Sequence, residues 1–350
     1  MTRIAVGRTD FSAVEVLDEA PVPLDDGQVR LAVDVFGLSA NNISYASAGD
    51  FLGYWSHFPV SDSLGCIPVW GFADVVESRH DDIAVGGRVF GYLPMASETV
   101  VQPAAVDDLA FHDAIAHRSA LHPWYTRMYR CAADPVYDAG AEGMIATLWA
   151  LFMTGWALAA ELSATARTVV VSSASSKTSL SMAWAMQQLD AEVDVVGLTS
   201  AGNVGFVEAS GVYDTILTYD DLSLADVTGP AAYVDIAGNA SVKQAVHDAL
   251  GDRLTDSVLV GGTHKGAGAA SGELSGPAPR FFFIPDVAEQ HEGGHPAFHA
   301  DFASAWARFL PWIDGRLVLD TATGLDAIVA TYRRVLGDNP RPNESTVLSW

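Results

Sequence analysis

The residues best suited to chemistry form a serine-rich stretch, Ser172 to Ser179, between an apolar segment and an amphipathic one. The segment TVVVSS predicts a buried strand, and SLSMAWAMQQLD predicts a helix. A turn from strand to helix presents backbone N–H groups that bind anions. Small side chains admit a diphosphate, hydroxyls can donate to it, and Lys177 adds a cation. We therefore predict a dinucleotide site that includes Ser173, Ala174, Ser175, Ser176, Lys177 and Thr178.

This turn contains no glycine, so a second interpretation stays open, in which the serines cap the helix and the lysine faces solvent. The triplet Ser-Lys-Thr also occurs in phosphate-binding P-loops. That motif requires two glycines, and Val171 and Ser176 stand at their positions. No matching acidic metal ligand is evident either, so a P-loop is excluded.

The next predicted strand, VDVVGLTS, bears on the choice of dinucleotide. A site for NAD usually ends this strand with Asp or Glu, which binds the ribose and repels a 2′-phosphate. Here the strand ends with Thr199 and Ser200, and Asn203 follows. Uncharged donors favour NADP(H) over NAD(H), although the same residues would also cap the following helix.

Composition excludes several classes of protein. The 350 residues carry a formal charge of −24, which repels nucleic acid and anionic membranes. With 49% hydrophobic residues the chain is too apolar for disorder, and its length predicts two domains.

Two cysteines cannot supply a disulfide framework, and no secretory signal is visible, so we expect a cytoplasmic protein. The apolar run 144–160 falls short of the ~20 residues that span a bilayer and predicts a buried helix.

The order of predicted elements indicates an α/β protein with two domains. Residues 1–110 read as short strands separated by turns, and 112–137 as an aromatic, partly helical insertion. Strands then alternate with helices from Thr168 onward, which is typical of a doubly wound parallel sheet. We expect a β-rich domain over 1–140 and 290–350, and a Rossmann-like domain over 141–289.

Three further features of the sequence could be sites. His291 to His295 reads H-E-x-x-H, but two internal glycines and Pro296 oppose the helix that a zinc site of this type needs, so we expect a loop and no metal. Cys66 has no base nearby in the sequence and is expected to be a buried small hydrophobe. Arg118 and His122 are candidates for binding an acidic group of a substrate, or are solvated helix residues.

The order of segments resembles the medium-chain dehydrogenase/reductase superfamily, in its zinc-free quinone-oxidoreductase-like branch. The first domain resembles a GroES-like substrate domain in VRLAVDVFGLSANNISYASAGD and GGRVFGYLP. The second resembles the cofactor domain in VVVSSASSKTSLSMAWAMQQLDAEVDVVGLTS, GVYDTILTYDD, YVDIAG and DSVLVGG. Segments NNISYA, PVWGFA and SSASSKT are closer to an uncharacterised subgroup known only as a domain of unknown function.

The resemblance implies roles for further residues. It places Asn42, Tyr45 and Tyr54 near the nicotinamide end of the cleft, with a tyrosine as proton donor and Asn42 orienting a carbonyl. It places Thr154 against the nicotinamide, and Tyr219, Gly238 and Gly261 at the cofactor. Residues 39–44 lack the catalytic cysteine, and the segment at Cys66 the His-Glu pair, of the zinc-dependent branch, so no catalytic zinc is expected. Relatives pair through an edge strand, for which 281–284 is the candidate in a homodimer.

Two functions are therefore compared. The first is an NADPH-dependent, zinc-independent oxidoreductase that transfers hydride to a small enone, quinone, enoyl thioester or carbonyl substrate. The alternative is a binding or scaffold protein that keeps the fold without redox activity. The missing glycines favour the alternative, and the small residues with Lys177 favour the enzyme.

Overall fold

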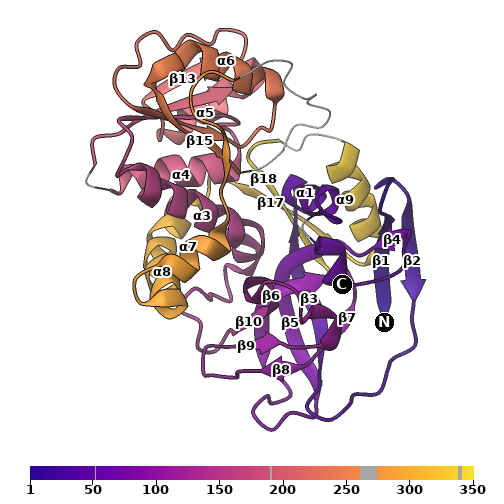
Figure 1. Ribbon diagram of the computed structural model, residues 1–350. Helices are drawn as coiled ribbons and strands as arrows, with labels where there is room; N and C mark the ends of the chain where they lie inside the picture. The colour runs from indigo at the N-terminus through magenta and orange to yellow at the C-terminus, as the bar shows by residue number, and fades with distance from the viewer. Residues whose placement is uncertain (52, 190, 261–273, 338–340) are drawn as a thin grey trace. The chain divides into compact units, whose positions relative to one another are not determined.

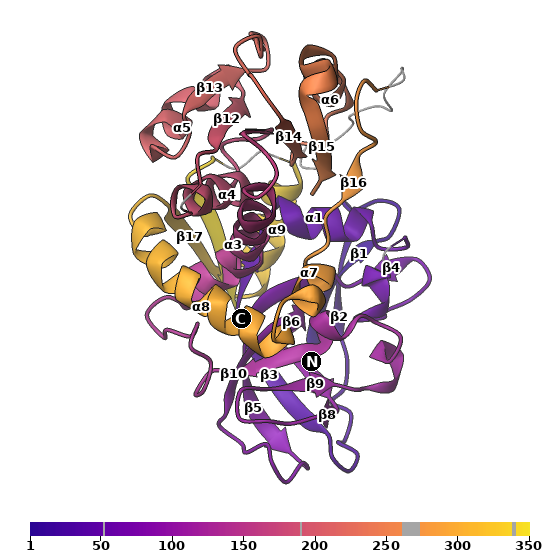
Figure 2. The ribbon, with the colours of Figure 1, turned by 60° about the vertical axis from the view of Figure 1, so that its left-hand side comes forward.

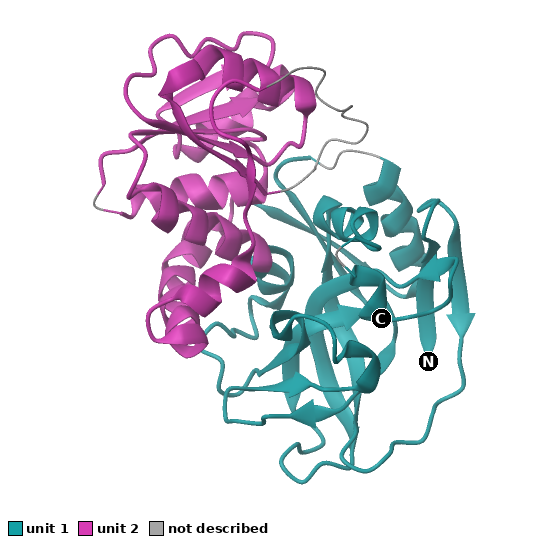
Figure 3. Ribbon diagram, in the orientation of Figure 1, with its two compact units in different colours: residues 1–149, 317–350 teal, residues 150–316 magenta. Residues whose placement is uncertain are grey.

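Alternating hydrophobicity in the first 110 residues forms strands, and the later alternation of strands with helices forms a parallel sheet, so the predicted α/β class is confirmed. The computed structural model describes residues 1–51, 53–189, 191–260, 274–337 and 341–350. The chain forms two compact units (Figure 3). Unit 1 comprises Met1–Trp149 and Leu317–Trp350, and unit 2 comprises Ala150–Arg316.

Unit 1 is built on a nine-stranded, mostly antiparallel sheet. Its strand order is β17 (Val318–Thr323), β18 (Glu344–Ser349), β3 (Val29–Leu38), β5 (Pro68–Ser78), β6 (Arg88–Pro94), β10 (Arg127–Arg130), β9 (Ala110–Asp113) and β8 (Pro103–Ala104), with β7 (Glu98–Val101) also paired to β3. A smaller sheet has the order β2 (Val14–Asp18), β1 (Thr2–Gly7) and β4 (Leu64–Gly65). The sheets enclose an apolar core that includes Val33, Phe36 and Val69.

Two helices of unit 1 lie side by side, α1 (Ala40–Ser47) and α9 (Leu325–Gly337) (Figure 1). Helix α9 buries Ile328, Tyr332 and Val335 in the core of unit 1. The shorter helical segments are η1 (Tyr54–Ser56), η2 (Ala116–Arg118) and α2 (Pro123–Thr126).

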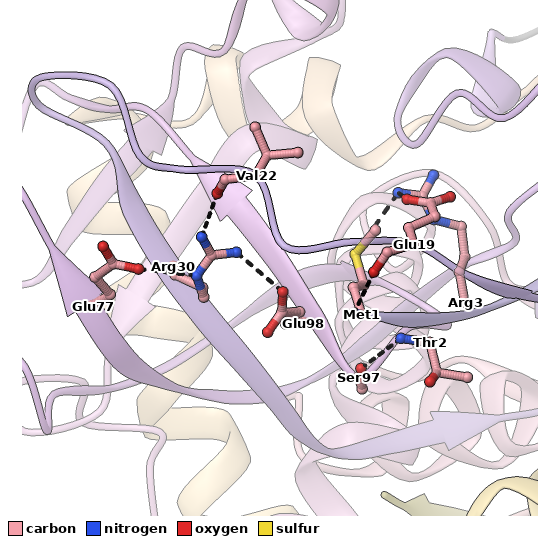
Figure 4. A network of polar contacts seen from close by, with 9 residues as sticks. All are labelled: Met1, Thr2, Arg3, Glu19, Val22, Arg30, Glu77, Ser97 and Glu98. Carbon is pink, nitrogen blue, oxygen red and sulfur yellow. Dashed lines mark hydrogen bonds and ion pairs between the residues drawn. The ribbon is translucent and has the colours of Figure 1, made fainter.

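Buried and half-buried charges fasten the strands of unit 1 to one another. The guanidinium of Arg30 contacts Glu98 at 3.0 Å and Glu77 at 3.2 Å, and it donates to the carbonyl of Val22 (Figure 4). Near the chain's start, the backbone N–H of Thr2 donates to Ser97 Oγ at 3.0 Å. These contacts join the region of β1 and β2 to β3, β5 and β7, and the largely buried Arg30 keeps charged partners in Glu77 and Glu98.

Unit 2 contains the parallel sheet. Its order is β13 (Thr215–Thr218), β12 (Asp194–Thr199), β11 (Thr168–Val171), β14 (Ala231–Asp235), β15 (Leu254–Leu259) and β16 (Arg280–Phe281), with every pairing parallel. The connecting helical segments are α4 (Lys177–Gln187), η3 (Ala201–Asn203), α5 (Val204–Ser210), α6 (Ala240–Leu250) and η4 (Gly251–Arg253). This is the doubly wound arrangement predicted from the sequence, and its order reverses between β11 and β14.

Helix α3 (Glu142–Leu162) contains the long apolar run, and the boundary between the units falls within it. By length and composition α3 could cross a membrane, but 61% of its most apolar window is buried inside the protein. Gly155 allows the close approach of α3 to α4, because a Cβ there would lie 2.6 Å from the backbone nitrogen of Met182. The run therefore forms a core helix, as predicted.

The predicted domain boundaries differ from the observed units. Helix α8 (Gly294–Ile313) belongs to unit 2, whereas 290–350 was grouped with the β-rich domain. The reason is aromatic packing, since Phe302 and Phe309 of α8 contact Phe152 of α3. Helices α7 (Ile284–Gln290) and α8 lie next to each other (Figure 2).

The segment 112–137 was expected to be partly helical, and most of it is not. Its helical content is limited to η2 and the single turn of α2. Strand β10 follows directly and pairs with β6 and β9, so this segment is an integral part of the nine-stranded sheet. Both central residues of β10, Met128 and Tyr129, are buried, so the strand is held by its pairing and by burial on both faces of the sheet.

Candidate functional site

The turn between β11 and α4 has an unusual backbone conformation. Ser173 has a φ of 52°, in the left-handed region that favours glycine. The carbonyl of Ser173 accepts from the N–H of Ser176 at 2.7 Å, which closes the turn. The chain thus makes, with a serine, the left-handed turn for which a glycine was missing in the sequence.

The predicted phosphate-binding residues take different positions within this turn. Ser176 is the N-cap of α4, and its Oγ accepts from the N–H of Ser179 at 3.1 Å. The capping interpretation therefore holds for Ser176. Ala174 and Thr178 are buried, while Ser173, Ser175 and Lys177 are partly exposed at the start of the helix. Four of the six predicted residues, Ser173, Ser175, Ser176 and Lys177, are thus partly exposed, and the hydroxyl of Ser176 is used in capping the helix.

The turn lies at the point where the strand order reverses, and buried polar contacts join its two sides. Ser172 Oγ donates to Asp235 Oδ1 at 3.1 Å and accepts from the N–H groups of Ile236 and Ala237 at 3.0 Å each. Gly238, with a φ of 65°, donates its N–H to the same carboxylate at 2.9 Å. The carboxyl ends of β11 and β14 are therefore locked together where doubly wound sheets bind ligands.

The end of β12 carries the residues predicted to select the dinucleotide. Thr199 is buried, and its hydroxyl has no hydrogen-bond partner among the described residues. Ser200 is exposed and precedes η3 without capping it. Asn203 donates from Nδ2 to Ser175 Oγ at 3.1 Å, which links this strand end to the turn after β11. The structure thus brings Asn203 and Ser175 together.

Three other predicted cofactor residues come from separate segments. Thr154 lies on α3, where its hydroxyl donates to the carbonyl of Ala150 at 2.9 Å, next to the glycine that contacts α4. The hydroxyl of Tyr219 accepts from the N–H of Ser173 at 2.8 Å, so Tyr219 is part of the turn. Gly261 lies outside the described residues.

Unit 1 contains a cluster of five aromatic residues that we call the phenol cluster. Its members are Tyr45, Tyr54, His57, Tyr92 and Tyr125. The rings of Tyr45 and Tyr54 are 4.8 Å apart between centroids, so the two predicted tyrosines do meet. The hydroxyls of Tyr54 and Tyr125 are 3.1 Å apart.

Burial keeps the phenol cluster uncharged. It raises the pKa of Tyr45, Tyr54, Tyr92 and Tyr125 above the ordinary phenol value. Burial also lowers the pKa of His57 to about 3, and the nearby Arg118 contributes to the same shift. The hydroxyl of Tyr92 is buried and has no hydrogen-bond partner among the described residues. The cluster therefore offers neutral O–H donors in an apolar setting.

Asn42 lies on α1 beside the phenol cluster, but both ends of its amide are engaged. Its Oδ1 accepts from the N–H of Ser39 at 2.8 Å, and its Nδ2 donates to the carbonyl of Pro68 at 3.0 Å. The neighbouring Asn41 donates to the hydroxyl of Tyr45 at 2.8 Å. Asn42 thus caps α1 and attaches it to β5, while Asn41 contacts the tyrosine.

No sequence pattern marks His57, Tyr92 and Tyr125 as members of the cluster. Tyr92 occupies a strand position that reads as ordinary core, and Tyr125 lies in the segment interpreted as an insertion. His57 follows the YW pair of η1 and had no motif to mark it. Only the meeting of β6, α2 and η1 reveals the cluster.

Arg118 and His122 have local partners in unit 1. Arg118 is buried, forms an ion pair with Asp113 and donates from Nε to the carbonyl of His57 at 2.7 Å. It is therefore not a solvated helix residue. His122 is the N-cap of α2, where Nδ1 accepts from the N–H of Trp124 at 3.2 Å.

The H-E-x-x-H string does not lie on one helix. His291 follows α7 and pairs with Asp301 at 3.3 Å, whereas His295 is in the first turn of α8. Within the described part of the chain, no group of three His, Cys, Asp or Glu residues could hold a metal ion. Cys66 is fully buried, and burial raises the pKa of its thiol to about 12, so it is a poor nucleophile.

Comparison with known proteins identifies both a family and a fold. The model of the family described as protein of unknown function (DUF2855) matches residues 36–340. No curated protein matches the chain in sequence.

Among solved structures, the chain is similar to CurA in complex with NADPH from Vibrio vulnificus (14% identity, TM-score 0.60, covering 100% of this chain and 99% of that one). It is also similar to mycobacterial Rv1454c complexed with NADPH (16%, TM-score 0.58, 100% of both chains). A third similar structure is the quinone oxidoreductase from Coxiella burnetii, with 14% identity and a TM-score of 0.55, covering 100% of this chain and 99% of that one. The expected medium-chain dehydrogenase/reductase architecture is thereby confirmed as a fold.

The low pKa of His57 predicts a pH dependence of stability. The unfolded histidine has a pKa near 6.5, so between about pH 6.5 and 3 the unfolded chain binds a proton that the folded chain does not. The stability from neutral His57 is complete above pH 6.5 and is lost as the pH falls. Between pH 6 and 5 the wild type should lose about 1 kcal/mol more than His57→Phe.

Urea unfolding at several pH values measures this difference. His80→Gln is the control, because His80 is partly exposed in a loop after β5. If the free energy of unfolding depended on pH in the same way in the wild type and in His57→Phe, the low pKa of His57 would be contradicted.

Proposed function

The chain belongs to the family described as protein of unknown function (DUF2855), and we propose that it is an NADPH-dependent, zinc-independent oxidoreductase. Its substrate is a small enone, quinone, enoyl thioester or carbonyl compound. The observation that carries the proposal is the left-handed turn of Ser173 at the reversal point of a six-stranded parallel sheet. The similar folds of CurA and Rv1454c, both solved with NADPH, support it.

The residues of the turn fit a diphosphate. Ser173 and Ser175 would donate hydroxyl hydrogen bonds, and the ammonium group of Lys177 would add charge at the N-terminus of α4. Ala174 and Thr178 contribute their backbone to the turn, and Ser176 fixes its shape as the helix cap. Gly238 would line the β14 side of the reversal point. The whole set comes from unit 2.

The end of β12 favours NADPH over NADH. Thr199, Ser200 and Asn203 present no carboxylate that would repel a 2′-phosphate. The buried hydroxyl of Thr199, without a partner among the described residues, suits a ribose or phosphate oxygen. Thr154 on α3 would contact the nicotinamide.

When bound, NADPH supplies a hydride, and the phenol cluster would donate hydrogen bonds to the oxygen of a substrate. Hydride addition to a conjugated or carbonyl compound leaves negative charge on oxygen, and neutral O–H donors stabilise it. Tyr54, paired with Tyr125, is the proposed proton donor, because its raised pKa keeps the phenol protonated. Tyr45 is the second candidate, held by Asn41. Asn42 would act by fixing α1, which carries Tyr45.

The surroundings of the phenol cluster favour a neutral substrate. Arg118, the buried cation nearest in sequence to Tyr125, is paired with Asp113. The cluster members themselves remain uncharged at neutral pH. A charged substrate group would lose its hydration there without gaining an ionic partner.

The alternative is a scaffold protein that has this fold without redox activity. Its supporting observation is that Tyr219 already accepts the N–H hydrogen bond of Ser173. Titration with NADPH and with NADH, followed by fluorescence, separates the two functions. Binding of NADPH supports the reductase, and binding of neither nucleotide favours the scaffold.

Lys177→Ala should weaken NADPH binding about tenfold, because a charge-assisted contact with the diphosphate is lost. Isothermal titration at low and high salt measures the effect, which should shrink at high salt. Arg308→Ala, on the partly exposed helix α8, removes a cation away from the turn and should leave the affinity unchanged. Equal affinity of Lys177→Ala and wild type would remove Lys177 from the site.

Tyr54→Phe should lower turnover about 10²-fold without changing NADPH affinity, because the proton donor is lost while the cofactor unit is intact. The assay is NADPH oxidation with 1,4-benzoquinone, 2-cyclohexenone or crotonyl thioester as substrate. Tyr137→Phe is the matched control, since its phenol donates to Glu142 outside the cluster. A normal rate in Tyr54→Phe would transfer the role to Tyr45 or to water.

We also propose a homodimer formed through the predicted edge at 281–284, of which only Phe281 lies in strand β16, since Phe282 is buried and Ile284 begins α7. This strand is the edge of the parallel sheet, and Phe281 is 58% exposed and stacked on Phe283. Exposed apolar edges invite pairing with a second chain. Phe281→Asp should give a monomer by light scattering, while Val318→Asp, on the edge strand of unit 1 and 54% exposed, should remain dimeric. A monomeric wild type would contradict the proposal.

A further inference from the structure

Ser173 keeps a conformation that is costly for a residue with a side chain. Its φ of 52° lies in the left-handed region, where a Cβ is strained against the backbone. Such strain persists only where the surroundings impose the conformation. The contacts that impose it are therefore informative about how the turn works.

Two phenol hydroxyls contact the turn on consecutive residues. The hydroxyl of Tyr219 accepts from the N–H of Ser173 at 2.8 Å, and that of Tyr213 donates to the carbonyl of Ala174 at 2.7 Å. Between these bonds, the N–H of Ala174 donates to the carbonyl of Leu198 at 2.9 Å. Three backbone groups of two adjacent residues are thereby held.

The two tyrosines are themselves fixed at the two ends of β13. Tyr213 precedes this strand and Tyr219 follows it, with the N–H of Tyr219 donating to the carbonyl of Thr199 at 3.0 Å. The ring of Tyr219 packs against the apolar core of the sheet. The hydroxyls therefore approach the turn from a rigid element.

A glycine in the neighbouring strand makes this arrangement possible. At Gly197 of β12, a Cβ would lie 2.9 Å from the Cβ of Ala174 and 2.9 Å from Cδ1 of Tyr213. The absence of that Cβ lets both groups pack against the strand. Close approach is thus provided by a glycine in β12, although the turn itself contains none.

The geometry points to Tyr213 and Tyr219 as positioning residues that hold the glycine-free turn in its left-handed, nucleotide-binding conformation. Their side-chain hydrogen bonds hold the left-handed conformation that a glycine would adopt without strain. This inference rests on the proposed function, because it assigns the turn to nucleotide binding. It predicts that loss of the Tyr219 hydroxyl weakens NADPH binding, whereas a tyrosine that blocked the site would weaken binding by being present.

A double-mutant cycle tests the inference with Tyr219→Phe, Ser173→Gly and the combined variant. Without the Tyr219 hydroxyl, Ser173 relaxes from the left-handed region, so Kd for NADPH should rise about three- to tenfold. In the Ser173→Gly background the left-handed turn carries no Cβ strain, so the same change should raise Kd less than about twofold. Fluorescence titration with NADPH gives the four values.

Melting temperatures without nucleotide provide a readout that does not depend on the proposed function. Tyr219→Phe should lower Tm more with Ser173 present than in the Ser173→Gly background. If the wild type binds no NADPH, the proposed function fails, and this second cycle alone decides whether the tyrosine supports the turn. If Tyr219→Phe does not fold, Tyr213→Phe takes its place in the same cycle.

Tyr332→Phe is the matched control, because its phenol also bonds to the backbone, donating to the carbonyl of Phe11 in unit 1 at 2.8 Å. It should lower Tm without changing Kd and without coupling to Ser173→Gly. Equal losses from Tyr219→Phe in both backgrounds would overturn the inference. Tighter NADPH binding by Tyr219→Phe would also overturn it and would identify Tyr219 as an obstruction.

Discussion

Parallel pairing of β11 with β12 on one side and β14 on the other determines the geometry of unit 2. This pairing brings the carboxyl ends of three strands to one edge, where Ser172, Thr199 and Asp235 follow or end them. Asp235 is fully buried, and its Oδ1 accepts hydrogen bonds from Ser172 and Gly238, which lock the strand ends together. Its Oδ2 has no hydrogen-bond partner among the described residues and lies 3.7 Å from the ammonium group of Lys243.

The turn after β11 shows how a fold can keep a conformation after its usual residue is replaced. A left-handed backbone is easily reached by glycine and is strained for serine. Here the hydroxyl of Tyr219 bonds to the strained Ser173, while the hydroxyl of Tyr213 and a glycine in the adjacent strand contact the next residue, Ala174. The replacement also adds hydroxyl groups at the position where an anion would bind, which matters in a chain with so few cations.

Unit 1 combines an aromatic site with an elaborate scaffold of charges. The phenol cluster is neutral because burial disfavours both the phenolate and the imidazolium forms. The charges are paired with one another, as in the contacts of Arg88 with Asp34, Asp74 and Glu142, and the buried Arg118 beside His57 is paired with Asp113. The phenol cluster thus keeps neutral O–H groups in a largely buried setting.

Much of the architecture was predictable from local sequence patterns. Period-two strands such as β3, the alternation from β11 to β15, and the buried helix α3 were all expected, because each element carries its own hydrophobic repeat. The strand in the segment 112–137 was harder to predict, since the four residues of β10 are too few to show a repeat. Helix α8 was assigned to the other domain because nothing local reveals which aromatic residues it will meet.

The residue types alone show which chemical groups stand at the β11–α4 turn, and the charge and cysteine content exclude several classes of protein. The contacts that these groups make depend on the tertiary fold. It made Ser176 a cap, brought Tyr219 to Ser173, and assembled His57, Tyr92 and Tyr125 around the predicted tyrosines. The reason is that hydrogen-bond partners and burial depend on residues far apart in the chain, which meet only after the strands have paired.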